Sequence, residues 1–183
     1  MLTGNQIILE NVAHQDLDKL RTWRNNPEYR KYFREYRELN ADNQEKWYQS
    51  KVLNDPNTIM FSIKDKYTRE LLGCCGLCYI NWVHRYADLS LYIGWENSYI
   101  DNRGFAEDSC RVLFQYAFQE LNLNKIWTEI YEFDEKKLAL YQTLGFKIDG
   151  VLREQYFYDG KWWSSNMLSL LRSEWNPGNV NEH

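Results

Sequence analysis

The sequence predicts a single α/β (α+β) domain in which a mixed sheet of about seven strands is flanked by about four helices. Three observations predict this class. Strand-like segments alternate with helical segments along the chain. Between residues 90 and 121, a strand pattern is followed by a loop and then by an amphipathic helix. Near the C-terminus, Asp159-Gly160 is a hairpin turn signal between two long strand-like segments.

The elements follow in order from the apolar spacing and from the turn-forming residues. Strands are predicted over residues 6–10, 58–64, 70–80, 86–93, 125–131, 146–158 and 162–171. Helices are predicted over residues 14–23, 42–53, 105–121 and 134–144, and residues 28–39 are expected to form a short helix and an irregular loop. The resulting order is βααβββαβαββ, which places helices on both faces of the sheet.

Composition limits the classes of function and partner. The 183 residues are enough for one domain with its own core, which we expect over residues 1–175, followed by a flexible tail over residues 176–183. The net charge of −4 and the lack of a basic run argue against nucleic-acid binding and are compatible with a cationic amine substrate. No signal-like N-terminus and no apolar run near the ~18 residues of a membrane span are present, so a cytoplasmic protein without a membrane partner is expected.

The four cysteines do not form a recognisable metal-binding set. Cys75-x-x-Cys78 has the spacing of a metal or redox pair, but no second pair follows it, and the three histidines are scattered. We therefore interpret Cys74, Cys75, Cys78 and Cys110 as structural thiols and expect no metal.

The start of the helix at residues 102–106 is a candidate anion site. A helix N-terminus has unpaired N–H groups and partial positive charge, Gly104 permits close approach of the backbone, and Arg103 adds a cation. The alternative interpretation is an ordinary helix start with a turn glycine.

Four sequence blocks resemble the GNAT superfamily of N-acetyltransferases. Arg103-Gly104-Phe105-Ala106 is similar to the family's acetyl-CoA pyrophosphate loop, and Leu140 to Phe146 (LYQTLGF) is similar to its Leu-Tyr-x-x-Leu-Gly-Phe block. Asn81 to Leu89 and Trp23 to Glu28 resemble segments of the branch that acetylates ribosomal-protein N-termini, polyamines and amino sugars. The blocks occur in the family order and span nearly the whole chain.

The resemblance implies a mostly antiparallel sheet and acetyl-CoA as co-substrate. It assigns the acetyl-CoA arm and phosphates to Leu91, Tyr92, Ile93, Asn102, Arg103, Gly104, Phe105, Ala106, Asp134 and Lys137. Departures from the family pattern include Lys137, where alanine is common, and Glu107, whose charge is adverse near a phosphate unless it points outward.

The resemblance also implies two catalytic residues. Tyr141 would protonate the leaving thiolate, and its alternative role is that of a packing tyrosine on an amphipathic helix. Asp88 would take the proton of the amine, and its alternative role is that of a strand-edge carboxylate paired with Arg85.

The acceptor site is expected in residues 28–39, with Tyr32, Phe33 and Glu35 as substrate-binding residues; the alternative is a solvated mixed-charge face. The sequence does not distinguish between three amine acceptors: a ribosomal-protein N-terminus, a polyamine, and an amino sugar or other small amine. A non-catalytic acyl-CoA-binding sensor or interaction module of the same fold is the rival function. The abundant aromatic residues and the hairpin at Val151 to Leu171 favour a homodimer.

Overall fold

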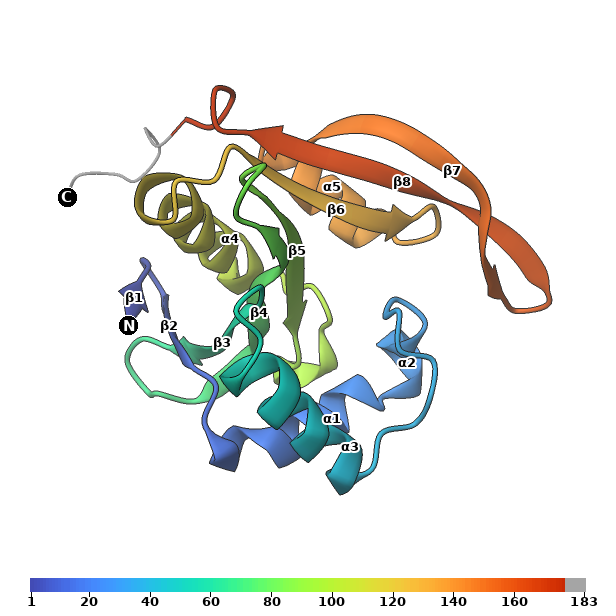
Figure 1. Ribbon diagram of the computed structural model, residues 1–183. Coiled ribbons are helices and arrows are strands. Elements are labelled where there is room, and N and C mark those ends of the chain that lie inside the picture. Colours follow the sequence, from blue (N-terminus) through green and yellow to red (C-terminus); the bar gives the residue numbers. More distant parts are fainter. Residues whose placement is uncertain (177–183) are drawn as a thin grey trace.

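The computed structural model describes residues 1–176, in which one eight-stranded sheet carries helices on both faces (Figure 1). The strand order is β1-β2-β3-β4-β5-β6-β8-β7, and all neighbours are antiparallel except β5 and β6. The predicted fold class, a mixed and mostly antiparallel sheet, is therefore confirmed. The strands are β1 (Leu2–Thr3), β2 (Ile7–Asn11), β3 (Ile59–Asp65), β4 (Leu71–Asn81), β5 (Tyr86–Ile93), β6 (Lys125–Tyr131), β7 (Lys147–Tyr158) and β8 (Lys161–Leu171).

One strand and several helix boundaries differ from the prediction. The two-residue β1 is too short to show an alternating pattern, which is why the sequence predicted about seven strands. The helices are α1 (Leu17–Arg24), α2 (Pro27–Arg30), α3 (Ala41–Trp47), α4 (Phe105–Gln115) and α5 (Glu135–Thr143). Short helical turns precede α1 (His14–Asp16), follow α3 (Tyr48–Leu53), precede α4 (Trp95–Asn97) and extend α4 (Tyr116–Glu120).

Local capping explains where several helices begin. The Asn26 side chain accepts a hydrogen bond from the Glu28 N–H, and Asn40 accepts one from the Asn43 N–H, so each satisfies an amide that the helix itself leaves free. Asp134 caps α5 by accepting the Lys137 N–H at 3.2 Å. The predicted loop over residues 28–39 begins with the single helical turn of α2, which Pro27 starts.

The sheet separates two apolar cores because successive side chains of a strand point to opposite faces. Cys75 lies in the core under α4 and α5, where Leu113, Phe114 and Phe118 are buried. Its neighbour Cys74 lies in the core under α1. The four cysteines are free thiols.

The sheet opens between β5 and β6. Their parallel pairing covers only Tyr86 to Asp88 against Lys125 to Trp127, and β5 continues to Ile93 without β6 beside it. Beyond Asp88 the β6 side of β5 therefore lacks a paired strand, although the Ile93 N–H donates to the Tyr99 carbonyl at 2.8 Å; β4 still pairs with the other edge. This opening is what positions the candidate site.

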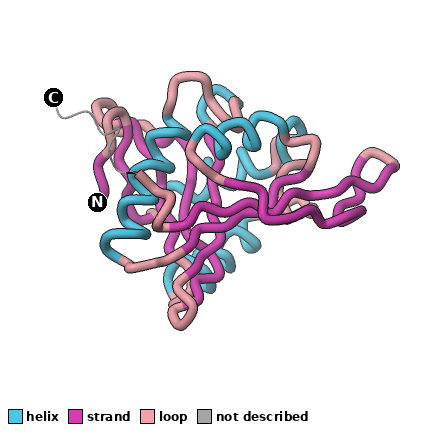
Figure 2. The backbone as a smooth tube through the Cα atoms, turned by 90° about the horizontal axis from the view of Figure 1, so that it is seen from above, coloured by secondary structure: helices cyan, strands magenta, loops and turns pink. Residues whose placement is uncertain are grey.

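The C-terminal hairpin extends away from the rest of the domain (Figure 2). Its turn residues Asp159 and Gly160 have φ values of 51° and 76°, as the Asp-Gly signal predicts. Exposed apolar side chains follow both strands: Ile148, Val151, Leu152, Phe157, Tyr158 and Trp162. The predicted tail falls almost entirely outside the described residues, since these end at residue 176. Over residues 1–176, no helix is long and apolar enough to cross a bilayer.

Candidate active site

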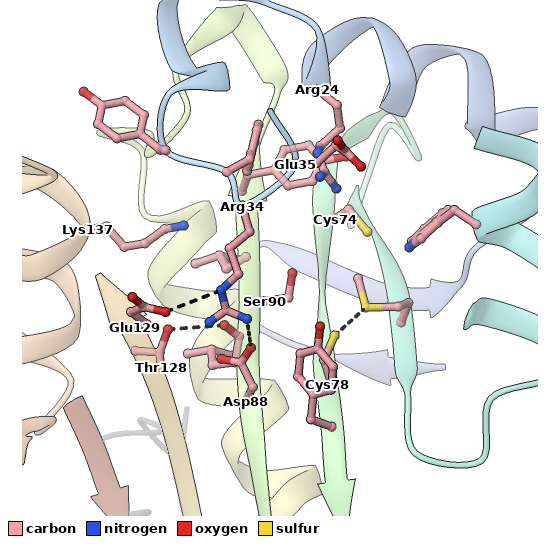
Figure 3. Close-up of a pocket in the computed structure, with 18 of the residues that line it drawn as sticks. Arg24, Arg34, Glu35, Cys74, Cys78, Asp88, Ser90, Thr128, Glu129 and Lys137 are labelled. Atoms are coloured by element: carbon pink, nitrogen blue, oxygen red, sulfur yellow. Dashed lines mark hydrogen bonds and ion pairs between the residues drawn. The ribbon is translucent and has the colours of Figure 1, made fainter. Parts of the chain in front are cut away.

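A cavity of about 230 Å³ lies beside the opening between β5 and β6 (Figure 3). Its lining comes from α1, the loop after α2, α3, strands β3, β4, β5 and β6, and α5. Of the predicted site residues, the cavity brings together Tyr32, Phe33, Glu35, Asp88, Leu91, Tyr92 and Lys137. Tyr141, Ile93, Asp134 and residues 102–106 are not among its lining residues.

Asp88 stands at the point where β5 and β6 separate. It is 4% exposed, and its Oδ2 accepts a hydrogen bond from the Arg34 guanidinium at 2.8 Å. Its Oδ1 is buried without a hydrogen-bond partner. Burial raises the pKa of Asp88 to about 6, although Arg34 acts in the opposite direction. The alternative pairing with Arg85 is wrong, because the ion-pair partner is Arg34.

Arg34 is a site residue that the sequence did not single out. Its guanidinium lies between Asp88 and Glu129, with its Nε 3.8 Å from a Glu129 oxygen (Figure 3). The Thr128 hydroxyl approaches the Leu89 carbonyl across the opening at 3.5 Å. The sequence could not single out Arg34, because its segment contains several arginines. The one signal for this cluster was Thr128, a polar residue at a buried position of a strand with apolar neighbours.

Aromatic side chains form the wall that was predicted for the acceptor. Tyr32 stacks on Tyr99 with ring centroids 4.4 Å apart, and Phe33 packs edge-on against Tyr92 at 5.3 Å. Glu35 accepts two side-chain hydrogen bonds from Arg37, each 2.8 Å long. These bonds lower the pKa of Glu35 to about 2, so its carboxylate is ionised and already paired.

Helix α5 presents its two predicted site residues differently. Lys137 points into the cavity (Figure 3), and its Nζ lies 4.8 Å from the centre of the Tyr99 ring. Burial lowers the pKa of Lys137, with Asp134 and Asp88 acting against the shift. Tyr141 is 0% exposed and stacks on Phe146 at 5.2 Å.

The Tyr141 hydroxyl has no hydrogen-bond partner, and burial raises the pKa of this group. Asp134 is fully engaged instead: one oxygen accepts the Lys137 N–H, and the other accepts the Tyr99 hydroxyl at 2.5 Å. The catalytic role of Tyr141 and the cofactor role of Asp134 both stay predictions.

The N-terminus of α4 forms an anion site that already holds a carboxylate of the same chain. Asp101 accepts N–H bonds from Arg103 at 2.8 Å, Phe105 at 2.9 Å and Ala106 at 2.8 Å. Gly104 makes this loop possible with a φ of 90°. Three amides thus converge on one anion, and the pyrophosphate role of this loop stays a prediction.

The side chains around this loop are compatible with an incoming phosphate. Asn102 and Arg103 are exposed, and the Arg103 guanidinium lies 5.5 Å from the Trp95 and Phe105 ring centres. Glu107 pairs with Arg111 at 2.7 Å, which offsets its adverse charge. Within residues 1–176, no group of three or more His, Cys, Asp or Glu side chains is placed to hold a metal ion.

Known proteins share this sequence pattern and this architecture. The family model described as an acetyltransferase (GNAT) domain matches residues 6–147. A spermidine N(1)-acetyltransferase of Vibrio cholerae is 28% identical over 172 residues, which cover 94% of this chain and 96% of that protein. A putative ribosomal N-acetyltransferase of Bacillus subtilis is 30% identical over 109 residues, covering 60% of this chain and 58% of that one.

Solved structures of the Vibrio cholerae spermidine N-acetyltransferase have the same fold. Its complex with CoA and spermine superposes with a TM-score of 0.83 at 27% identity, covering 92% of this chain and 97% of that one. A dodecameric structure of that enzyme gives a TM-score of 0.77 at 25% identity, with 92% and 95% covered. The chain therefore belongs to the GNAT acetyltransferase family and is an acetyl-CoA-dependent N-acetyltransferase.

Proposed function

We propose that this protein acetylates a primary amine of a small molecule that binds in the 230 Å³ cavity. The observation that carries the proposal is Asp88, whose unpaired Oδ1 lies at the opening between β5 and β6 and whose side chain lines the cavity. Acetyl-CoA supplies an acetyl group that is already activated as a thioester. Attack by an amine needs a base close to the opening, and Asp88 meets this requirement.

The cofactor would lie along the β5 edge and reach the start of α4. The Leu91 backbone would hold its extended arm, because β6 does not pair with that part of β5, and Tyr92 and Ile93 are the adjoining contacts that the sequence predicts. The backbone of Tyr92 faces β4, and the Ile93 N–H donates to the Tyr99 carbonyl at 2.8 Å. The amides from Arg103 to Ala106, together with Asn102, would hold its phosphates once Asp101 has moved aside. Asp134 and Lys137 are the further cofactor contacts that the sequence predicts.

Asp88 would take the proton that the amine loses. Its pKa of about 6 keeps most of the group ionised at neutral pH, and its partner Arg34 holds the carboxylate in place through Oδ2. The departing sulfur needs a proton in return. Tyr141 on α5 is the donor that the sequence predicts.

The lining of the cavity supports an amine as acceptor. Aromatic rings of Tyr32, Phe33 and Tyr92 can contact an ammonium group and the methylene chain beside it. The spermidine acetyltransferase relatives favour a polyamine, and the ribosomal acetyltransferase relative favours a protein N-terminus. The cavity lining carries three cationic side chains and three carboxylates, so its charge favours none of these amines over the others: Arg24, Arg34, Lys137, Glu35, Asp88 and Glu129.

Thiol release from acetyl-CoA tests the function. The assay would use spermidine, glucosamine and an alanine-initiated peptide as acceptors, and mass spectrometry would detect the acetylated products. Turnover that is highest with spermidine or glucosamine supports a small-amine acceptor, and turnover with the peptide alone contradicts it. Binding of acetyl-CoA without turnover on any acceptor would favour the non-catalytic module.

We also propose that two copies associate through the β7–β8 hairpin. Phe157 and Trp162 are both more than half exposed, with ring centres 5.2 Å apart, and this is a large apolar area for a protruding arm. The dodecamer of the Vibrio cholerae relative shows that a protein of this fold can self-associate.

A further inference from the structure

Arg34 covers the carboxylate that the acceptor amine has to reach. Asp88 is only 4% exposed, its Oδ2 accepts the Arg34 hydrogen bond at 2.8 Å, and its Oδ1 is buried without a partner. A base has to come within about 2.6–3.2 Å of the group whose proton it takes. An amine therefore gains access to Asp88 when the Arg34 guanidinium withdraws from Oδ2.

The guanidinium of Arg34 occupies a site that is built to hold a cation (Figure 3). Asp88 on β5 and Glu129 on β6 flank it from the two sides of the opening, with Arg34 Nε 3.8 Å from a Glu129 oxygen. The Ser165 hydroxyl donates to the other Glu129 oxygen at 2.6 Å and so fixes this carboxylate. The Trp127 ring centre lies 5.8 Å from the guanidinium carbon, within the range of a cation–π contact. Two carboxylates and an indole ring thus converge on one positive charge.

Arg34 is attached to the molecule in a way that allows it to leave. Its side chain is 45% exposed, and residues 31–40, which carry it, contain no helix or strand. An unoccupied site would leave Asp88 and Glu129 facing each other without a counter-ion in a partly buried space, which is unfavourable. The guanidinium should therefore leave only when another cation enters. The adjoining cavity of about 230 Å³, which all three residues line, offers room for a small amine.

We infer that Arg34 is a resident cation in the acceptor's ammonium site, and that the acceptor binds by taking its place between Asp88 and Glu129. This inference rests on the proposed function of the site. The exchange of one cation for another keeps both carboxylates neutralised, and it brings the ammonium directly against Asp88, the proposed base. The substrate class follows from this exchange: the acceptor is an amine that is positively charged at neutral pH. Arg34 is then a specificity-determining residue, because only a cation can compete with it.

The third carboxylate of the cavity is less suited to this exchange. Glu35 accepts two side-chain hydrogen bonds from Arg37, each 2.8 Å long, and paired bonds of this kind make an arginine–carboxylate contact strong. Arg34 makes one hydrogen bond to Asp88 and a longer contact of 3.8 Å to Glu129. An incoming ammonium therefore competes more easily for Asp88 and Glu129 than for Glu35.

Methylguanidine tests the site directly, because it has the head group of arginine without the rest of the side chain. Arg34→Met keeps an apolar stem and loses the charge, so calorimetry should show methylguanidine binding to the variant about tenfold or more tightly than to the parent protein. N-Methylurea, a neutral molecule of similar shape, should bind neither protein. Arg30→Met removes an arginine that pairs with Glu38 outside the cavity lining and should behave as the parent.

The pH of the titration has to keep Asp88 ionised. Burial raises the pKa of Asp88 to about 6 in the parent, and loss of Arg34 should raise this pKa further, since Arg34 acts against the shift. The other charged or titratable groups near Asp88 are Glu129, Lys137 and Cys78, the residue opposite it on β4. Measurements at pH 8.5 keep the carboxylate ionised and methylguanidine charged.

Kinetics at the same pH provide a second readout. Arg34→Met should lower the KM of spermidine, or of the best cationic acceptor of the panel, by about tenfold and change kcat much less, because a competitor for binding has been removed. Glu129→Gln in the Arg34→Met background should reverse this gain, since one of the two carboxylates is then lost. Arg34→Gln loses the charge but keeps a hydrogen-bond donor for Asp88, and it replaces Arg34→Met if that variant does not fold.

Three results would overturn the inference. The first is methylguanidine binding that is no tighter in Arg34→Met than in the parent. The second is a loss of about 10²-fold in kcat at unchanged KM in both Arg34 variants, which would make Arg34 a permanent positioning residue of the base. The third is an equal gain in Arg30→Met, which would show a general effect of net charge. A parent protein that is inactive on every amine would contradict the proposed function, whereas the methylguanidine titration would still report on the site.

Discussion

The two ends of the proposed cofactor path differ in how their polar groups are satisfied. At the start of α4, the amides of Arg103, Phe105 and Ala106 all donate to Asp101. At the opening of the sheet, Asp88 Oδ1 is buried without a partner. The start of α4, where the phosphates would bind, therefore has its amides paired without a ligand. The opening between β5 and β6, where acetyl transfer would occur, retains a buried oxygen without a hydrogen-bond partner.

This difference indicates where the fold tolerates the free-energy cost of burying a polar atom without a hydrogen bond. Buried polar groups in native proteins are nearly always hydrogen-bonded, so unpaired ones concentrate where a ligand or a reaction uses them. The raised pKa of Asp88 and the lowered pKa of Lys137 occur at the same end of the path. Substitutions at the opening should mainly change turnover, and substitutions at α4 should mainly change affinity.

The largest effect is expected from Asp88→Asn. Removing the base should reduce kcat by about 10²–10⁴-fold at pH 7.5. In the parent protein, Asp88 is protonated as pH falls through about 6, so activity should decline below that pH, and this acidic decline should be absent from the variant. Steady-state kinetics from pH 5 to 9 would measure both changes.

Stability provides the control for Asp88→Asn. A carboxyl whose pKa is higher in the folded than in the unfolded state stabilises the fold most at low pH and loses that contribution as pH rises through its folded pKa. At pH 7.5 the variant should therefore melt no lower than the parent. Asp149→Asn removes an exposed carboxylate that pairs with Lys125 far from the cavity and should retain full activity. Equal activity of the two variants would show that Asp88 is not the base.

A smaller effect is expected from Gly104→Val, which changes the predicted phosphate-binding loop at the start of α4. Its φ of 90° is unfavourable for a β-branched residue by about 1–3 kcal/mol, and the added side chain would obstruct a phosphate. Calorimetry should show acetyl-CoA affinity reduced by about tenfold or more. Gly160→Val introduces comparable strain at the hairpin tip, where φ is 76°, and should not change affinity.

Unchanged acetyl-CoA affinity in Gly104→Val would locate the phosphates elsewhere. A similar loss of affinity in Gly160→Val would show that strain, rather than obstruction of the ligand, is responsible.

Asp101→Ala should have a modest effect of opposite sign on affinity. Removing the competing carboxylate should strengthen acetyl-CoA binding by about two- to fivefold, corresponding to about 0.4–1 kcal/mol. The loss of the helix cap should destabilise the fold by about 0.5–2 kcal/mol. Asp42→Ala removes an acidic residue from the first turn of α3 and is the matched control. Weaker binding in Asp101→Ala would mean that Asp101 organises the loop for the cofactor.

The smallest effect on catalysis is expected from Trp162→Ser, which tests the hairpin. Trp162 is 58% exposed on β8, so the substitution should leave the fold intact. Light scattering at micromolar concentration should show the mass of a dimer for the parent and that of a monomer for the variant. Tyr67→Ser, at another exposed aromatic position, should not change the mass. A monomeric parent would remove the proposal of a homodimer.

The sequence by itself determined the elements whose signals are local. The apolar spacing of α4, the αL glycine at its start and the Asp-Gly hairpin turn each depend on interactions within a few residues. The resemblance in four blocks added the family and seven of the twenty residues that line the cavity. The two-residue β1 escaped prediction because its pairing with β2, rather than any pattern of its own, defines it.

Only the tertiary structure decided how the side chains of the site are paired. Arg34 and Asp88 are 54 residues apart, and their contact depends on how the loop after α2 folds over β5. Lys137 and Tyr141 lie on one short helix, yet the packing of α5 sends one side chain into the cavity and buries the other beside Phe146. Sequence spacing specifies the face of a helix, but the neighbours of that face come from strands far away in the chain.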